Sequence, residues 1–182
     1  MERPFRLDFF AAFADDLAAV QNSSPRVLEL GSGPGFLADY LLKRLPALAM
    51  SLLDYSSAMH TLATARLGDR SGQVRFIERD FKDPAWPDGL GQFDAVITLQ
   101  SVHELRHKRY AGTLHAQVRS LLAPGGIYLV GDHYCGQDGM TNDQLYMSRA
   151  EQEQCLSAAG FTLKPLLIKG GRSLYRASLP GD

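Results

Sequence analysis

The chain has 182 residues, of which 45% are hydrophobic and 21% are charged, and its formal net charge is −1. This length fits one globular domain whose core is large enough to fold without disulfides or metal ions. The balanced charge argues against a nucleic-acid partner, and no apolar run approaches the about 18 residues of a membrane span. The only cysteines, Cys135 and Cys155, form no metal-binding pattern, which favours a reducing, cytoplasmic setting.

Hydrophobic periodicity predicts helices and strands that alternate along the chain. Residues 5–21 carry apolar side chains at helical spacing, and residues 26–30 form a short buried strand that runs into a glycine-rich turn. The same patterns then predict, in chain order, a helix over 36–45, a strand over 48–53, a helix over 57–67, strands over 74–77 and 93–99, a helix over 108–122, a strand over 127–130 and a helix over 148–159. Residues 161–168 and 172–178 flank Gly170-Gly171, which is typical of a hairpin.

This alternation predicts an α/β fold with a doubly wound, mostly parallel, seven-stranded sheet whose last strand is antiparallel. We expect a single domain over residues 1–182, with a core over 26–178 and a helix within 1–22 that could serve as a lid. Such sheets bind their ligands at the carboxyl ends of the strands, so the residues after each strand are the candidates for a site.

The first strand ends in Glu29-Leu30-Gly31-Ser32-Gly33-Pro34-Gly35. A dinucleotide fingerprint requires a small third residue; counted from Gly31 this position is Phe36, which fails, and counted from Gly33 it is Ala38, which passes. The alternation of an acid with three glycines resembles the first motif of the class I S-adenosylmethionine-dependent methyltransferases. The resemblance implies that S-adenosylmethionine binds at this turn, at Glu29, Gly31, Ser32, Gly33 and Gly35.

Later strand ends extend the resemblance. Asp54 and Tyr55 follow the second strand, where the family carries an acid that takes the ribose hydroxyls. Asp80 and Phe81 follow the third strand, where an acid accepts from the adenine amino group. Gln100 follows the fourth strand and is also expected to bind the cofactor. Both aspartates could instead be helix caps or turn residues, but their placement after successive strands favours contact with the cofactor.

Residues for the methyl acceptor are expected after the fourth and fifth strands. His133 is the first candidate for a general base and His103 the second, although a lone histidine is often structural. Asp132 beside His133 has no third ligand at metal-binding spacing, so no metal is expected. The loop 133–147 combines glycines with a few apolar side chains, which suits a lid over a small acceptor.

These patterns predict an S-adenosylmethionine-dependent methyltransferase that acts on a small molecule at oxygen or nitrogen. The stretch after the fourth strand lacks the tetrad of enzymes that methylate nucleic-acid amino groups, and no recognition domain is added. One alternative is a cofactor-binding regulatory or partner module that transfers no methyl group itself. A nicotinamide oxidoreductase is a third hypothesis, which Phe36 disfavours. The oligomeric state is left open.

Overall fold

A seven-stranded sheet runs through the middle of the computed structural model, which describes residues 4–181. The strands lie in the order β3-β2-β1-β4-β5-β7-β6, and β7 runs antiparallel to the other six strands. Their bounds are β1 Arg26–Leu30, β2 Ala49–Asp54, β3 Val74–Glu78, β4 Phe93–Leu99, β5 Leu122–His133, β6 Thr162–Lys169 and β7 Arg172–Ser178. The predicted sheet and terminal hairpin are confirmed. Residues 1–3 and 182 of the expected domain lie outside the described residues.

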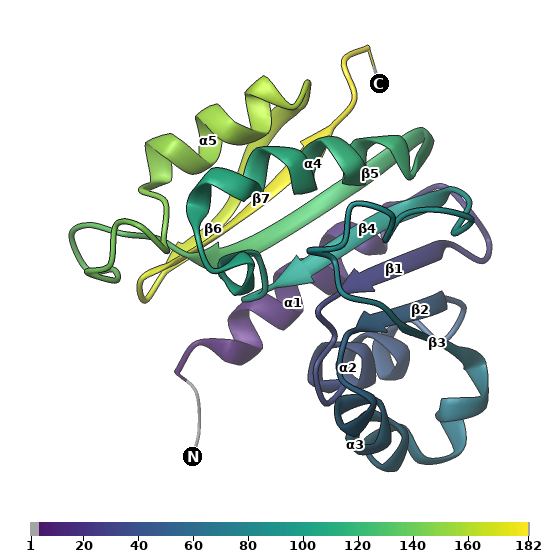
Figure 1. Ribbon diagram of the computed structural model, residues 1–182. Helices are drawn as coiled ribbons and strands as arrows, with labels where there is room; N and C mark the ends of the chain where they lie inside the picture. The colour runs from purple at the N-terminus through teal and green to yellow at the C-terminus, as the bar shows by residue number, and fades with distance from the viewer. Residues whose placement is uncertain (1–3, 182) are drawn as a thin grey trace.

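Five α-helices cover the two faces of this sheet (Figure 1). They are α1 Arg6–Leu17, α2 Phe36–Arg44, α3 Ser57–Leu67, α4 Ala111–Ser120 and α5 Arg149–Ala158. α4 and α5 pack on one face and α1, α2 and α3 on the other, so helices enclose the parallel strands on both sides. No helix among residues 4–181 is both long and apolar enough to cross a membrane.

Side chains of β1 alternate between the two faces, as the pleat of a strand requires. Val27 belongs to the core under α1, α2 and α3, whereas Leu28 and Leu30 belong to the core under α4 and α5. Glu29 has the parity of Val27, so its carboxyl group lies on the face that α1 and α2 cover. Burying a leucine on either face contributes about 1.5–3 kcal/mol, which a carboxyl group forgoes.

The fifth strand is much longer than the sequence predicts. It was expected over 127–130 but extends from Leu122 to His133, because it pairs with β4 on one edge and with β7 on the other. At its end His133 pairs with Arg172 of β7. The sequence predicts that His133 lies in the loop after the strand. In the structure it is the last residue of the strand.

A short 3₁₀ turn, Val102–Leu105, follows β4, and it was not expected from the sequence. It carries His103 back toward the end of β5. A second 3₁₀ turn, Lys108–Tyr110, precedes α4, so that the helix expected over 108–122 begins at Ala111 and ends at Ser120.

Helix α1 is fastened to the hairpin at the far end of the chain. Lys169 Nζ lies 2.7 Å from Asp8 Oδ2, and Arg176 Nη1 lies 3.0 Å from Asp16 Oδ2. Just before the helix, the Pro4 carbonyl accepts from Arg172 Nη2 at 2.6 Å. These contacts hold α1 beside the carboxyl ends of the strands.

Candidate active site

The glycine-rich turn after β1 has a backbone that few residues other than glycine adopt. Gly31 has a φ of 64° and Gly33 a φ of 53°, both in the left-handed region. A Cβ on Gly31 would collide with Ser101, whereas a Cβ on Gly33 would meet nothing within 4 Å. The turn is therefore packed against the segment after β4 at its start and open at Gly33.

Asp54, at the end of β2, fixes the shape of this turn. Its Oδ2 accepts from the backbone N–H of Gly33 at 2.8 Å, and its Oδ1 accepts from the N–H of Ser56 at 3.0 Å. Each carboxylate oxygen can accept a further hydrogen bond, so this anchoring is compatible with the predicted ribose contact. The side chain thus both orders the turn and presents acceptors beside it.

Glu29 is a buried acid without a partner for one oxygen. Its side chain is 4% exposed, and Oε2 makes no hydrogen bond. Burial, and secondarily the charge of Asp54, raises the pKa of Glu29 to about 8. A buried polar atom left unpaired costs about 1–3 kcal/mol, so this arrangement is suited to a ligand that supplies the missing donor.

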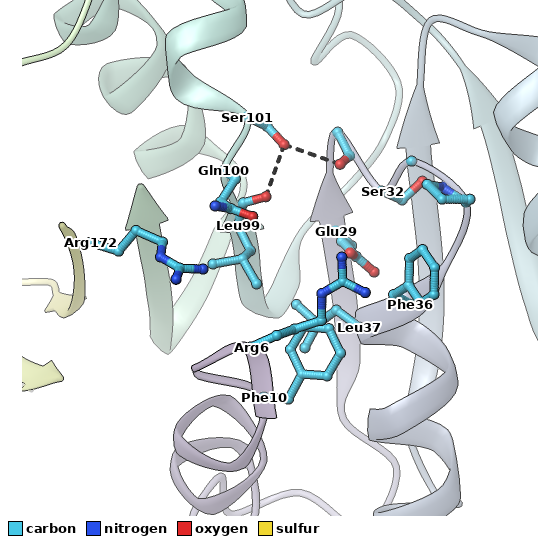
Figure 2. Close-up of a pocket in the computed structure, with 13 residues that line it drawn as sticks. Arg6, Phe10, Glu29, Ser32, Phe36, Leu37, Leu99, Gln100, Ser101 and Arg172 are labelled. Carbon is cyan, nitrogen blue, oxygen red and sulfur yellow. Dashed lines mark hydrogen bonds between the residues drawn. The ribbon is translucent and has the colours of Figure 1, made fainter. Parts of the chain in front are cut away.

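A cavity of about 190 Å³ opens between the glycine-rich turn and α1 (Figure 2). Arg6 and Phe10 reach it from α1, Glu29 lies at its floor, and Gln100 and Arg172 form the side toward β4 and β7. The two arginines and Phe10 come from segments that the sequence patterns did not connect with the turn.

Three further candidates, Tyr55 after β2 and Asp80 and Phe81 after β3, are not among the residues that line this cavity. Asp80 is more than one third exposed, and its Oδ1 accepts from the N–H of Lys82 at 2.9 Å. Tyr55 is 66% exposed with Lys82 Nζ at 5.8 Å from its ring centroid. Phe81 packs close to Gly31. Their positions follow the neighbouring strand ends in order, as expected; the adenine contacts of Asp80 and Phe81 and the cofactor contact of Tyr55 stay predictions.

A second cavity, of about 590 Å³, adjoins the first. Gln100 and Arg172 line both cavities, and the second also has His103, Glu104 and His133 in its wall. Because the two cavities share side chains, a group bound in one would lie next to a group bound in the other.

His103 has a carboxylate partner, Asp132. His103 Nδ1 lies 2.7 Å from Asp132 Oδ1, and the His103 backbone N–H donates to Oδ2 at 2.9 Å. Burial alone would lower the pKa of His103, but the hydrogen bond and charge of Asp132, with the charge of Glu104, outweigh it and raise this pKa. With Nδ1 donating to the carboxylate, Nε2 is the ring nitrogen that can take up a proton.

His133 has a different environment. Its Nε2 lies 2.7 Å from Gln100 Nε2, so the amide donates to the ring when the imidazole is neutral. Burial is the main cause that lowers the pKa of His133; the charge of Asp132 opposes it, and the charges of His103 and Arg172 act in the same direction as burial. The His133 ring is thus neutral, and its Nε2 already accepts a hydrogen bond from the Gln100 amide.

Tyr146 joins the two histidines from the loop 133–147. Its ring centroid lies 5.2 Å from that of His103 and 6.0 Å from that of His133. Among residues 4–181 no three histidine, cysteine or acidic side chains gather as metal ligands do. The second cavity offers imidazole and carboxylate groups to a molecule that enters it, and Tyr146 packs beside the two imidazole rings.

Comparisons with known proteins identify the family. The methyltransferase domain family matches residues 27–126, more than half of the chain, and the chain belongs to it. A malonyl-[acyl-carrier protein] O-methyltransferase from Magnetococcus marinus is 35% identical over 41% of this chain and 26% of its own length. A non-reducing polyketide synthase, prhL, from Penicillium brasilianum is 30% identical over 59% of this chain, which spans only 4% of that synthase.

The structure of the glycopeptide N-methyltransferase MtfA bound to S-adenosylmethionine superposes with a TM-score of 0.71 at 18% identity, over 93% of either chain. This likeness supports the fold. The methyltransferase family, together with the glycine-rich turn, points to S-adenosylmethionine as the cofactor. The residues fit this cofactor, because the cavity is lined by Gly33, where the space for a side chain is open, and by Glu29, whose buried Oε2 has no hydrogen-bond partner.

Replacing Gly33 by valine should abolish binding of S-adenosylhomocysteine while the protein stays folded. The new side chain would fill the open space at the turn and strain a left-handed backbone, at a cost of about 1–3 kcal/mol in stability. Gly68 has a similar φ of 56° with nothing within 4 Å of its Cβ, so Gly68→Val is the matched control. Calorimetry showing equal affinity for the two variants would contradict this role of Gly33.

Replacing Glu29 by glutamine should stabilise the ligand-free protein at alkaline pH. The folded pKa of about 8 lies above the ordinary 4.5, so stability present at low pH is lost as Glu29 ionises toward pH 8. Glutamine cannot ionise, so the unfolding temperatures of the two proteins should agree near pH 5 and diverge by pH 9. If the unfolding temperatures of the two proteins differed by a constant amount from pH 5 to pH 9, the ionisation of Glu29 would not lower the stability of the folded protein.

Proposed function

We propose that the chain transfers a methyl group to a small-molecule acceptor at an oxygen or nitrogen atom that carries a proton. The observation that supports this most strongly is His103, which lines the cavity beside the proposed cofactor site and whose ring contacts the buried carboxylate of Asp132. When bound, S-adenosylmethionine supplies a methyl group on a positively charged sulfur, which needs no acid to leave.

In this proposal His103 is the general base. Its Nε2 takes the proton of the acceptor as the new bond to the methyl carbon forms, and Asp132 stabilises the resulting imidazolium. The backbone N–H of His103 and that of His133 also donate to Asp132, so the carboxylate stays fixed during this transfer. The raised pKa of His103 favours uptake of the proton.

His133, ranked first from the sequence, then has a positioning role. Its Nε2 is occupied by the Gln100 amide, and its lowered pKa keeps the ring neutral. A neutral imidazole and an amide beside the cavity can hydrogen-bond the acceptor without competing for its proton. His103 and His133 thus have distinct tasks, which their different partners assign.

Exclusion of water falls to two segments in this proposal. α1 places Arg6 and Phe10 over the cofactor cavity, and the loop 133–147 places Tyr146 beside both histidines. Excluding water strengthens the His103–Asp132 interaction and protects the methyl donor from hydrolysis. We also propose a cytoplasmic setting, in which Cys135 and Cys155 stay reduced.

A cofactor-binding module without its own transfer is the alternative. Such a module has no need of a proton acceptor next to the cofactor site, so the presence of the His103–Asp132 pair favours an enzyme. Incubation with S-adenosylmethionine labelled in the methyl group and a panel of phenols, carboxylic acids and amines separates the two. Binding of the cofactor without label in any product would support the module.

His103→Ala should lower the turnover number by about 10²–10⁴ and leave the affinity for S-adenosylhomocysteine unchanged. The wild-type rate should rise with pH through a value above the usual imidazole pKa of about 6.5, since the pKa of His103 is raised. The variant should lose this limb.

His107, in the same segment but outside both cavities, provides the control His107→Ala. His133→Ala should mainly raise the KM for the acceptor. A His103 variant that keeps the wild-type turnover number and pH profile would remove this residue from the mechanism.

A further inference from the structure

We propose that Gln152 is a positioning residue of the acceptor site: it completes the end of β5 and thereby holds Asp132, the partner of His103, in place. The inference rests on the proposed function, in which His103 takes up the proton of the acceptor. Gln152 lies in α5, lines neither of the two cavities described above and lies outside the matched residues 27–126. No motif of the sequence drew attention to it.

The end of β5 extends beyond the strand beside it. β4 ends at Leu99, which pairs with Gly131, and β5 continues along β7 through Asp132 and His133. Backbone groups of alternate residues point to the same edge of a strand, so those of His133 point, like those of Gly131, to the edge where β4 has ended. Backbone groups shielded from water need partners, so other donors and acceptors have to serve this edge.

Two side chains take the place of the missing strand. The N–H of His133 donates to Asp132 Oδ1 at 2.8 Å, and the carbonyl of His133 accepts from Gln152 Nε2 at 3.0 Å. The same Asp132 oxygen lies 2.7 Å from His103 Nδ1. The peptide groups on both sides of His133 are therefore fixed, one by the acid that His103 contacts and the other by Gln152.

Ser173 of β7 sets the orientation of the Gln152 amide. Its Oγ donates to Gln152 Oε1 at 2.6 Å, so the amide NH₂ group is the end that faces the His133 carbonyl. Gln152 is 6% exposed and Ser173 1% exposed. A void of only about 10 Å³ lies among Asp132, Gln152 and Ser173, at the lower limit for one water molecule, so a chain of water molecules has no room to replace the amide.

Helix α5 places Gln152 at this point. The helix begins at Arg149, and a capping box between Ser148 and Glu151 fixes that end. Gln152 and Leu156 lie four residues apart on the buried face of the helix. Leu156 packs into the core between α5 and the sheet, whereas Gln152 buries an amide where a second apolar side chain would gain more from burial. Its two hydrogen bonds to β5 and β7 account for this polar choice.

Through Asp132 this arrangement connects α5 with the base. Burial lowers the pKa of His103, and the hydrogen bond and charge of Asp132 raise it by more. Without the Gln152 amide the peptide after His133 loses its anchor, so the carboxylate is held less firmly against the His103 ring and this pKa should fall. The other titratable and charged groups around His103 are Glu104, Arg106, His133 and Tyr146. The substitutions proposed below leave all four in place.

The test follows the His103 ring by NMR titration of the ligand-free protein, with the spectrum of His103→Ala to assign its resonance. Gln152→Met keeps the length of the side chain and removes the amide, and it should move the midpoint of the His103 titration to lower pH. Ser173→Ala removes only the hydroxyl that orients the amide, so it should give a smaller change in the same direction. Gln154→Met makes the same substitution at an exposed position of α5 and should leave the midpoint unchanged.

Kinetics provide a second measurement once the acceptor panel has identified a substrate. Gln152→Met should lower kcat by about 5–30-fold, because the base is less well held, and should leave the KM for the acceptor within about twofold. The pH-dependent limb of kcat should move in the same direction as the His103 titration.

An unchanged titration of His103 in a folded Gln152→Met protein would overturn the proposal, because Gln152 would then only stabilise the fold. An equal change in Gln154→Met would assign the effect to α5 as a whole and would overturn it as well. If Gln152→Met does not fold, Ser173→Ala decides, and an unchanged titration in that variant rejects the proposal. An absence of methyl transfer to any acceptor would contradict the proposed function but leave the titration results intact.

Discussion

The site depends on the carboxylate of Asp132, which joins the ends of two neighbouring strands. This one side chain accepts from the backbone N–H of His103, from its ring, and from the N–H of His133. Without it, the 3₁₀ turn after β4 and the last residue of β5 would present unpaired donors to each other. Asp132 thereby sets the orientation of the His103 ring and holds the backbone of His133.

The features predictable from sequence are those that local patterns determine. The turn at Gly31 to Gly35 requires positive φ angles, so glycines recur at alternate positions and can be recognised in the sequence. Asp54, which accepts from the N–H of Gly33, lies one strand–helix–strand unit further along the chain and can be predicted from that spacing. The sheet is predictable as well, because strands buried on both faces appear in the sequence as short, continuous apolar segments between the helical patterns. The length of β5 was missed because strand pairing, a non-local property, extends it.

The pairing of the histidines was out of reach for the same reason. His103 and His133 look alike in sequence, and only the fold decides which one Asp132 contacts through its ring nitrogen. Arg6 and Arg172 carry no local sign of a site either, since tertiary packing alone brings them to the turn. A sequence can therefore rank candidates at strand ends, whereas the partner of each side chain decides its chemistry.

The attachment of α1 to the hairpin has a consequence for how the protein is made. Asp8 and Lys169 are separated by 161 positions, and Asp16 and Arg176 by 160, so α1 is synthesised well before the residues with which it forms these ion pairs. Contacts of this range close slowly, because the intervening chain must be ordered first. The cavity between the glycine-rich turn and α1 is thus complete only after β7, which contributes Arg172 to its wall, has been synthesised.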